Sequence, residues 1–276
     1  MKCPNCGTEN ENNAVSCSAC GARLEGGNDG AKTAAAGLKA VTAGGMVFGQ
    51  KARQARMKEV VDPSRIISVK AYNATIAVML LWGLLINYLL CWKVGSYTNL
   101  FPTMSPLVFL IGYLAVAIVG MLMTFKSQSP VVGFIGYNLV VIPFGLVIST
   151  LVEAYIKGGQ ANVVTQAFLY TLLIAVAILA TVIVFPRAFE KIGSALGIVL
   201  IGVIIAEILM LIFHVRQQWI SWVAAGLFSL YLGYDIYRSQ QYPKTIKNAV
   251  ASALDIYMDL ANLFIRLLEI MGKNDK

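Results

Sequence analysis

Charged residues are scarce in this chain. Asp, Glu, Lys and Arg make up 13% of its 276 residues, about half the share in an average soluble domain. Hydrophobic residues reach 58% and the mean hydropathy is +0.70, which excludes an ordinary water-soluble globule. His214 is the single histidine. This excludes a multi-histidine metal site and argues against histidine-based catalysis.

Cysteine is missing from most of the chain, because four of the five cysteines lie within the first twenty residues. They form two CxxC pairs, Cys3 with Cys6 and Cys17 with Cys20. Four thiolates at this spacing can close tetrahedrally around one zinc ion, and a closed four-cysteine site is structural rather than catalytic. A redox dithiol is the competing interpretation, but two matched pairs favour zinc. Residues 1–24 are therefore predicted to form a small zinc ribbon.

Long apolar segments follow from residue 71 onward. Each has about 19–24 residues, enough for a helix to cross roughly 30 Å of hydrocarbon. They predict an all-α membrane protein with seven transmembrane helices, at residues 71–92, 107–125, 131–152, 163–185, 192–213, 218–237 and 248–271. The last segment is the least apolar, so we expect this polar helix at the centre of the bundle.

Between the ribbon and the spans, residues 25–66 are rich in Gly, Ala and Thr and then basic, which predicts a flexible linker to a membrane domain at residues 67–276. The formal net charge is +8. Because the basic residues lie mostly in short segments between apolar runs, the charge indicates membrane topology, and we expect no nucleic-acid partner. Lys and Arg are more frequent in the segments that an inside amino terminus would place inside. This predicts a multi-pass cell-membrane protein with a cytosolic amino terminus and, after seven spans, an outside carboxyl terminus.

Ionisable residues inside the predicted spans are candidate functional residues, because charge in hydrocarbon is costly. The candidates are Glu269, close to the outer end of its span, and Glu207, Asp235, Asp255, Asp259, Asn262 and Arg266. The last four are spaced by four, three and four, so they share one helical face. One interpretation is an internal salt-bridge ladder in which Arg266 neutralises a carboxylate. The other is a carboxylate cluster that shares protons and offers oxygen ligands to calcium. Glu207 fits either a hydrogen-bonded core position or an ion path.

Two stretches near the carboxyl end resemble the signature of the Bax inhibitor-1 family, also called transmembrane Bax inhibitor motif proteins. They are Gly233-Tyr234-Asp235 and the run Ala251–Phe264, and the resemblance covers roughly residues 67–276. It implies seven spans and a calcium leak controlled by two aspartates, whose positions match Asp235 and Asp259, with Asp255 as an additional acid. It also implies an arginine latch near the end of the second span, where this sequence offers only Lys126.

These observations predict a membrane protein that is not an enzyme. The leading hypothesis is a pH-sensitive calcium leak channel in the lipid bilayer, with zinc as a structural metal, calcium as the transported ion and protons as the regulator. A regulatory or scaffold protein, whose zinc head binds a membrane-protein partner, is the first alternative. The second is an intramembrane aspartyl protease. Tyr234-Asp235 fits half of its signature, but Ile256-Tyr257-Met258-Asp259 lacks the expected Gly-x-Gly-Asp.

Overall fold

The computed structural model describes residues 2–3, 6–9, 19–20, 56–213 and 218–272. The chain divides into two compact units, residues 1–54 and residues 55–276. Within its described residues the second unit consists of helices. They are η1 (Pro63–Arg65, a 3-10 turn), α2 (Val69–Lys93), α3 (Tyr97–Leu100), α4 (Pro106–Lys126), α5 (Pro130–Lys157), α6 (Ala161–Val184), α7 (Pro186–Glu190), α8 (Gly193–Ile212), α9 (Gln218–Ser239) and α10 (Ile246–Met271).

The long helices α2, α4, α5, α6, α8, α9 and α10 coincide with the seven predicted apolar segments to within a few residues. Local chemistry sets several of their starts. The side-chain oxygens of Ser68, Ser105 and Thr245 accept hydrogen bonds from backbone N–H groups three residues later, as N-caps do. Proline occupies the first position of α4 and α5, where no intrahelical N–H is needed.

Three helices of the described part of the chain, α2, α5 and α6, are long and apolar enough to cross a membrane. Shorter apolar stretches lie in α4 (Ile111–Lys126) and in α8 (Ala195–Glu207). The helical fold class is therefore confirmed, and the count of seven crossings stays a prediction.

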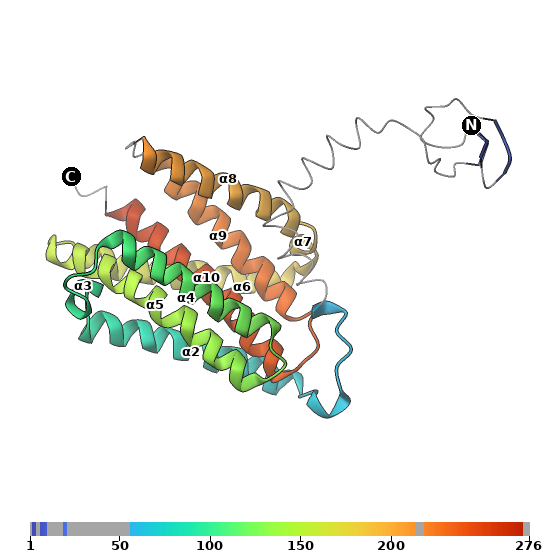
Figure 1. Ribbon diagram of the computed structural model, residues 1–276, viewed down its shortest axis with the longest axis horizontal. Helices are drawn as coiled ribbons and strands as arrows, with labels where there is room; N and C mark the ends of the chain where they lie inside the picture. The colour runs from blue at the N-terminus through green and yellow to red at the C-terminus, as the bar shows by residue number, and fades with distance from the viewer. Residues whose placement is uncertain (1, 4–5, 10–18, 21–55, 214–217, 273–276) are drawn as a thin grey trace. The chain divides into compact units, whose positions relative to one another are not determined.

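Helix α10 is the central element of the helical unit. It packs against α9, α2, α6, α5 and α4, and in Figure 1 it runs between the α8–α9 pair on one side and α2 on the other. Sixteen of its 26 residues are buried, against four of 24 in α6. A helix with a polar stripe is poorly suited to face lipid, and the prediction that it lies inside the bundle is confirmed.

Close backbone contact and buried hydrogen bonds join the helices around α10. A Cβ atom added at Gly136 of α5 would lie 2.5 Å from the carbonyl oxygen of Gly120 of α4, so these two helices touch through their glycines. The Tyr137 hydroxyl donates to the Met79 carbonyl of α2 at 2.7 Å. Such contacts matter because helices surrounded by lipid gain little from the hydrophobic effect and rely on small residues and hydrogen bonds.

Candidate functional site: buried carboxylates and arginines at one end of the bundle

Three ionisable side chains from α9 and α10 meet where these helices approach each other. Nη2 of Arg238 lies 3.0 Å from Oδ1 of Asp235, one turn earlier on α9, and 2.9 Å from Oδ2 of Asp255 on α10. Arg238 is 1% exposed, Asp235 is 4% exposed and the Asp255 side chain is 11% exposed. One buried guanidinium therefore neutralises a carboxylate on each helix and ties α9 to α10.

A second arginine reaches the same carboxylate from the segment before α2. Nη1 of Arg56 lies 3.6 Å from Oδ2 of Asp255. Its guanidinium lies 4.1 Å from the centre of the Tyr242 ring and 5.5 Å from that of Phe125, an arrangement that suits the flat, delocalised cation. Arg56 is 6% exposed. This residue of the predicted linker is thus packed within the helical unit.

Asp259 lies one turn beyond Asp255 on the same face of α10 and is also buried. The structure connects Asp235 to Asp255 through Arg238. The direct pairing of Asp235 with Asp259, which the resemblance implied, stays a prediction. Helix rise favours the connection of Asp235 to Asp255, because Asp255 lies about 6 Å nearer to the start of α10 than Asp259 does. We call Arg56, Asp235, Arg238, Asp255 and Asp259 the acid–arginine cluster.

The two arginines of the cluster were missed in the sequence. Lys126, the basic residue nearest to the position of the family's latch arginine, is exposed at the end of α4, whereas the cluster's ion pairs go to Arg56 and Arg238. Arg238 carries a local signal, since it follows Asp235 by three residues and so shares its helical face. Arg56 carries none, because it meets Asp255 only through the tertiary fold.

A second charged group lies further along α10. Nη1 of Arg266 is 2.7 Å from Oε1 of Glu207 on α8 and 3.1 Å from Oε2 of Glu269 on its own helix. The Ser221 hydroxyl of α9 donates to the same Glu269 oxygen at 3.1 Å. Arg266 therefore contacts two carboxylates, those of Glu207 and Glu269, and the internal salt-bridge ladder along the polar stripe stays a prediction. Asn262 donates its amide to a carbonyl of its own helix, one turn earlier, at 2.8 Å.

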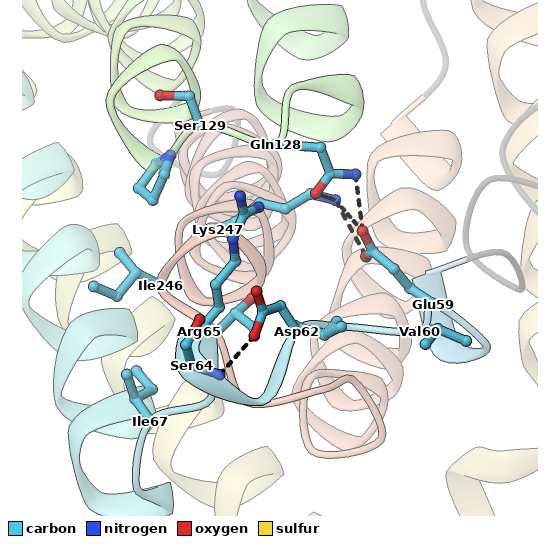
Figure 2. Close-up of a pocket in the computed structure, with 13 residues that line it drawn as sticks. Glu59, Val60, Asp62, Ser64, Arg65, Ile67, Gln128, Ser129, Ile246 and Lys247 are labelled. Carbon is cyan, nitrogen blue, oxygen red and sulfur yellow. Dashed lines mark hydrogen bonds and ion pairs between the residues drawn. The ribbon is translucent and has the colours of Figure 1, made fainter.

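A third polar contact fixes the segment that carries Arg56. Oε1 of Glu59 accepts hydrogen bonds from Nζ of Lys247 and from Nε2 of Gln128, both at 2.9 Å, and Figure 2 shows the two side chains converging on this carboxylate. Burial raises the pKa of Glu59, but these hydrogen bonds together outweigh it and hold the pKa below its ordinary value. We call Glu59, Gln128 and Lys247 the Glu59 clamp. A cavity of about 850 Å³ lies beside it, between residues 59–67 and the starts of α5 and α10.

The cysteines of the amino-terminal unit fit a zinc ion. The Sγ atoms of Cys3, Cys6 and Cys20 all lie within 4.8 Å of one another, and those of Cys3 and Cys20 are 3.7 Å apart. Two sulfurs of a tetrahedral zinc site, with Zn–S bonds of about 2.3 Å, lie roughly 3.8 Å apart. Gly7 has φ +76°, and its N–H donates to the Cys3 carbonyl at 2.9 Å, so a tight turn follows the first pair. Cys17 lies outside the described residues.

Two family models match the chain. One, described as inhibitor of apoptosis-promoting Bax1, matches residues 67–276, and a zinc-ribbon domain model matches residues 2–24. An uncharacterised protein of Campylobacter jejuni is 37% identical over 114 residues, which are 40% of this chain and 47% of that protein. An uncharacterised membrane protein of Streptococcus pyogenes is 30% identical over 139 residues, which are 48% of this chain and 59% of the relative. The chain thus spans about half the length of the curated relatives it matches.

Proposed function

This chain belongs to the Bax inhibitor-1 family, and from this premise we propose that it is a pH-sensitive calcium leak channel whose ion path passes the acid–arginine cluster. One observation carries the proposal: three carboxylates, Asp235, Asp255 and Asp259, are shielded from solvent on two adjacent helices of a helical membrane protein. Ionisable groups at such positions are costly and mark ion or proton paths. Carboxylate oxygens are also the ligands that calcium prefers.

The charge balance of the cluster supports control by protons. The cluster holds three carboxylates and two guanidiniums, so it carries a formal charge of −1 when every group is ionised. One bound proton makes it neutral, and loss of that proton leaves an excess negative charge in a low dielectric, which attracts a cation. We therefore expect calcium occupancy to rise with pH through the neutral range.

The phenols around the cluster do not supply that proton. Tyr72, Tyr234 and Tyr242 lie close to its arginines or carboxylates. Tyrosine ordinarily titrates near pH 10, and burial raises the pKa of Tyr242, in the α9–α10 connection, to about 12 although Arg238 and Arg56 oppose this. The proposal therefore assigns the regulatory proton to the carboxylates of the cluster.

Calcium flux into liposomes containing the purified protein, measured against pH, tests the proposal. We expect Asp235→Asn and Asp259→Asn to flatten the pH dependence, because each variant keeps the side-chain shape and removes one titrating group. Asp255→Asn should weaken calcium affinity more mildly, since two arginines already engage Asp255. Glu190→Gln is the matched control, because it removes an exposed carboxylate at the end of α7. If the three aspartate variants behave like the control, the carboxylates are structural and the proposed mechanism is wrong.

The zinc-binding unit favours a second candidate function, regulation through a partner protein. Residues 1–54 form a compact unit separate from residues 55–276, and a structural zinc site suits a binding module. A regulator would lose its partner's binding when Cys20→Ser removes the metal, whereas a leak formed by the helical unit would persist. Measuring flux and zinc content of this variant together separates the two functions.

An intramembrane aspartyl protease is less consistent with the geometry. Its two aspartates would have to share a proton, but the carboxylate of Asp235 faces the Arg238 guanidinium at 3.0 Å, and Ile256-Tyr257-Met258-Asp259 lacks the protease signature Gly-x-Gly-Asp. We therefore propose that the protein is not an enzyme.

The amino terminus is proposed to be cytosolic and the carboxyl terminus outside. Exposed Arg65, Lys70 and Lys126 lie at the end of the bundle where α2 begins and α4 ends, and cytosolic segments carry such an excess of Lys and Arg. An engineered cysteine next to Lys276, labelled with an impermeant reagent on intact cells, tests this orientation. Protection of that cysteine would contradict it.

A further inference from the structure

The segment from Arg56 to Ser68 is fastened across one end of the helix bundle. The backbone N–H of Ile67 donates to the carbonyl of Lys244, in the α9–α10 connection, at 2.8 Å. The Glu59 clamp fixes the same segment to the α4–α5 connection through Gln128 and to the first turn of α10 through Lys247. The segment thus touches both connections that flank the acid–arginine cluster at this end.

Arg56 is held in the cluster by its segment more than by its own hydrogen bonds. Among the described residues, neither its Nε nor its Nη2 has a hydrogen-bond partner. Its Nη1 lies 3.6 Å from Asp255, which is too far for a strong hydrogen bond. Nε and Nη1 of Arg238 likewise have no hydrogen-bond partner among the described residues, but its Nη2 lies within 3.0 Å of two carboxylates. A buried cation with so few hydrogen bonds is costly, so Arg56 can be withdrawn more easily than Arg238.

We propose that Arg56 is a tethered cation that plugs the entrance of the acid–arginine cluster and that the Glu59 clamp holds this plug in place. The inference rests on the proposed function in one respect, because it takes the cluster as the place where a cation binds. Arg56 and an incoming calcium ion compete for the same oxygen, Oδ2 of Asp255. Withdrawal of Arg56 leaves Arg238 as the remaining cation of the cluster beside its three carboxylates, which raises the negative charge available to calcium.

The clamp and the plug are mechanically linked to the cluster. Glu59 follows Arg56 by three residues, and its partner Lys247 lies on α10, the helix that carries Asp255. Breaking the Glu59–Lys247 contact would therefore loosen the attachment of Arg56 to α10. The cavity beside the clamp is lined in part by Glu59, Gln128 and Lys247 (Figure 2). Residues 1–54 lie just before Arg56 in the sequence. A partner that binds the zinc ribbon and pulls on the chain between the ribbon and Arg56 would therefore act on the plug.

Two measurements on the full-length protein test the plug. One is calcium flux in liposomes at fixed pH, and the other is the rise in melting temperature that calcium causes in detergent, which needs no flux. Arg56→Gln should lower the calcium concentration needed for both effects by about tenfold, as expected when a site that is free in only about a tenth of molecules becomes always free. Lys58→Gln is the matched control, because it removes an exposed positive charge two residues away and should change neither.

Glu59→Gln provides a second variant that leaves Arg56 in place. It weakens the clamp, so it should change both measurements in the same direction as Arg56→Gln and by less. Asp62→Asn is its control, since Asp62 is exposed and bonds only locally to the Ser64 N–H at 2.9 Å. If Arg56→Gln does not yield folded protein, the comparison of Glu59→Gln with Asp62→Asn tests the plug.

The outcomes separate the plug from the proposed function. If wild-type flux is present but Arg56→Gln and Glu59→Gln match their controls, the plug is wrong and the channel proposal stands. If no protein gives flux at any pH but Arg56→Gln still binds calcium more tightly than Lys58→Gln, the channel proposal fails and the plug stands. If neither flux nor calcium-dependent stabilisation differs between Arg56→Gln and Lys58→Gln, Arg56 is a structural residue only.

Discussion

Removing Arg238 should destabilise the protein strongly at high pH and weakly at low pH. In Arg238→Gln, Asp235 and Asp255 remain buried but lose the guanidinium that lies within 3.0 Å of both. Breaking a buried ion pair by removing one partner typically costs about 3–5 kcal/mol, because an uncompensated charge is left behind. The two carboxylates can escape this penalty by binding protons, so the loss should shrink as the pH falls. Thermal unfolding in detergent at about pH 8 and about pH 5 measures both effects.

Two further variants make this prediction specific. Arg65→Gln removes an exposed arginine from η1 and should change the free energy of unfolding by no more than about 0.5 kcal/mol. Adding Asp235→Asn to Arg238→Gln removes one stranded charge and leaves Asp255 with its second partner, Arg56, so the double variant should regain part of the lost stability. The reasoning is refuted if Arg238→Gln is as mild as Arg65→Gln, or if its penalty is equal at both pH values.

Three other predictions concern the helix packing, the clamp and the metal. Gly136→Ala should destabilise the helical unit by about 1–3 kcal/mol, because its Cβ would lie 2.5 Å from a carbonyl oxygen of α4. Thermal unfolding compares it with Gly112→Ala, whose Cβ meets nothing within 4 Å and which should be nearly neutral. Although burial raises the pKa of Glu59, hydrogen bonds from Lys247 and Gln128 lower this pKa below the 4.5 of the unfolded chain. The ionised Glu59 therefore contributes stability above pH 4.5, and this contribution is lost as the pH falls through the folded pKa. A plot of melting temperature against pH should accordingly fall less steeply on the acid side for Glu59→Gln than for the wild type. Elemental analysis should find one zinc per wild-type chain and none after Cys20→Ser.

The helices were largely predictable because their signals are local. Apolar segments of spanning length mark each long helix, and the caps Ser68 and Thr245 and the prolines at the starts of α4 and α5 lie at the boundaries themselves. The short elements η1, α3 and α7 were not predicted, since three to five residues give no periodic pattern. The central place of α10 was predictable for a physical reason. A polar stripe on an apolar helix has to be covered by other helices when lipid surrounds the bundle.

The candidate site was only half predictable. Carboxylates within apolar segments stand out, so Asp235, Asp255 and Asp259 were found from their residue type and spacing alone. Their cationic partners were not found. Arg238 lay at the end of a span, where a basic residue is ordinarily attributed to membrane topology. Arg56 lay within a stretch whose composition predicts a flexible linker, and nothing in that stretch indicates a contact with α10.

Arg238 and Arg56 stabilise the buried acids in different ways. Arg238 contacts carboxylates on two helices at hydrogen-bond distance, so removing it strands two charges, and it cannot leave during a functional cycle without a large penalty. Arg56 lies at a longer distance and stacks on Tyr242 and Phe125, contacts that can be exchanged for water and a calcium ion at smaller cost. In the proposed channel, Arg238 on α9 is the permanent counter-ion and Arg56 on the segment before α2 is the removable one, so the acids would stay buried while Asp255 would stay within reach of a cation. Glu59 fastens the segment that carries Arg56. It can do so at neutral pH because its pKa lies below the ordinary value, so the carboxylate stays ionised.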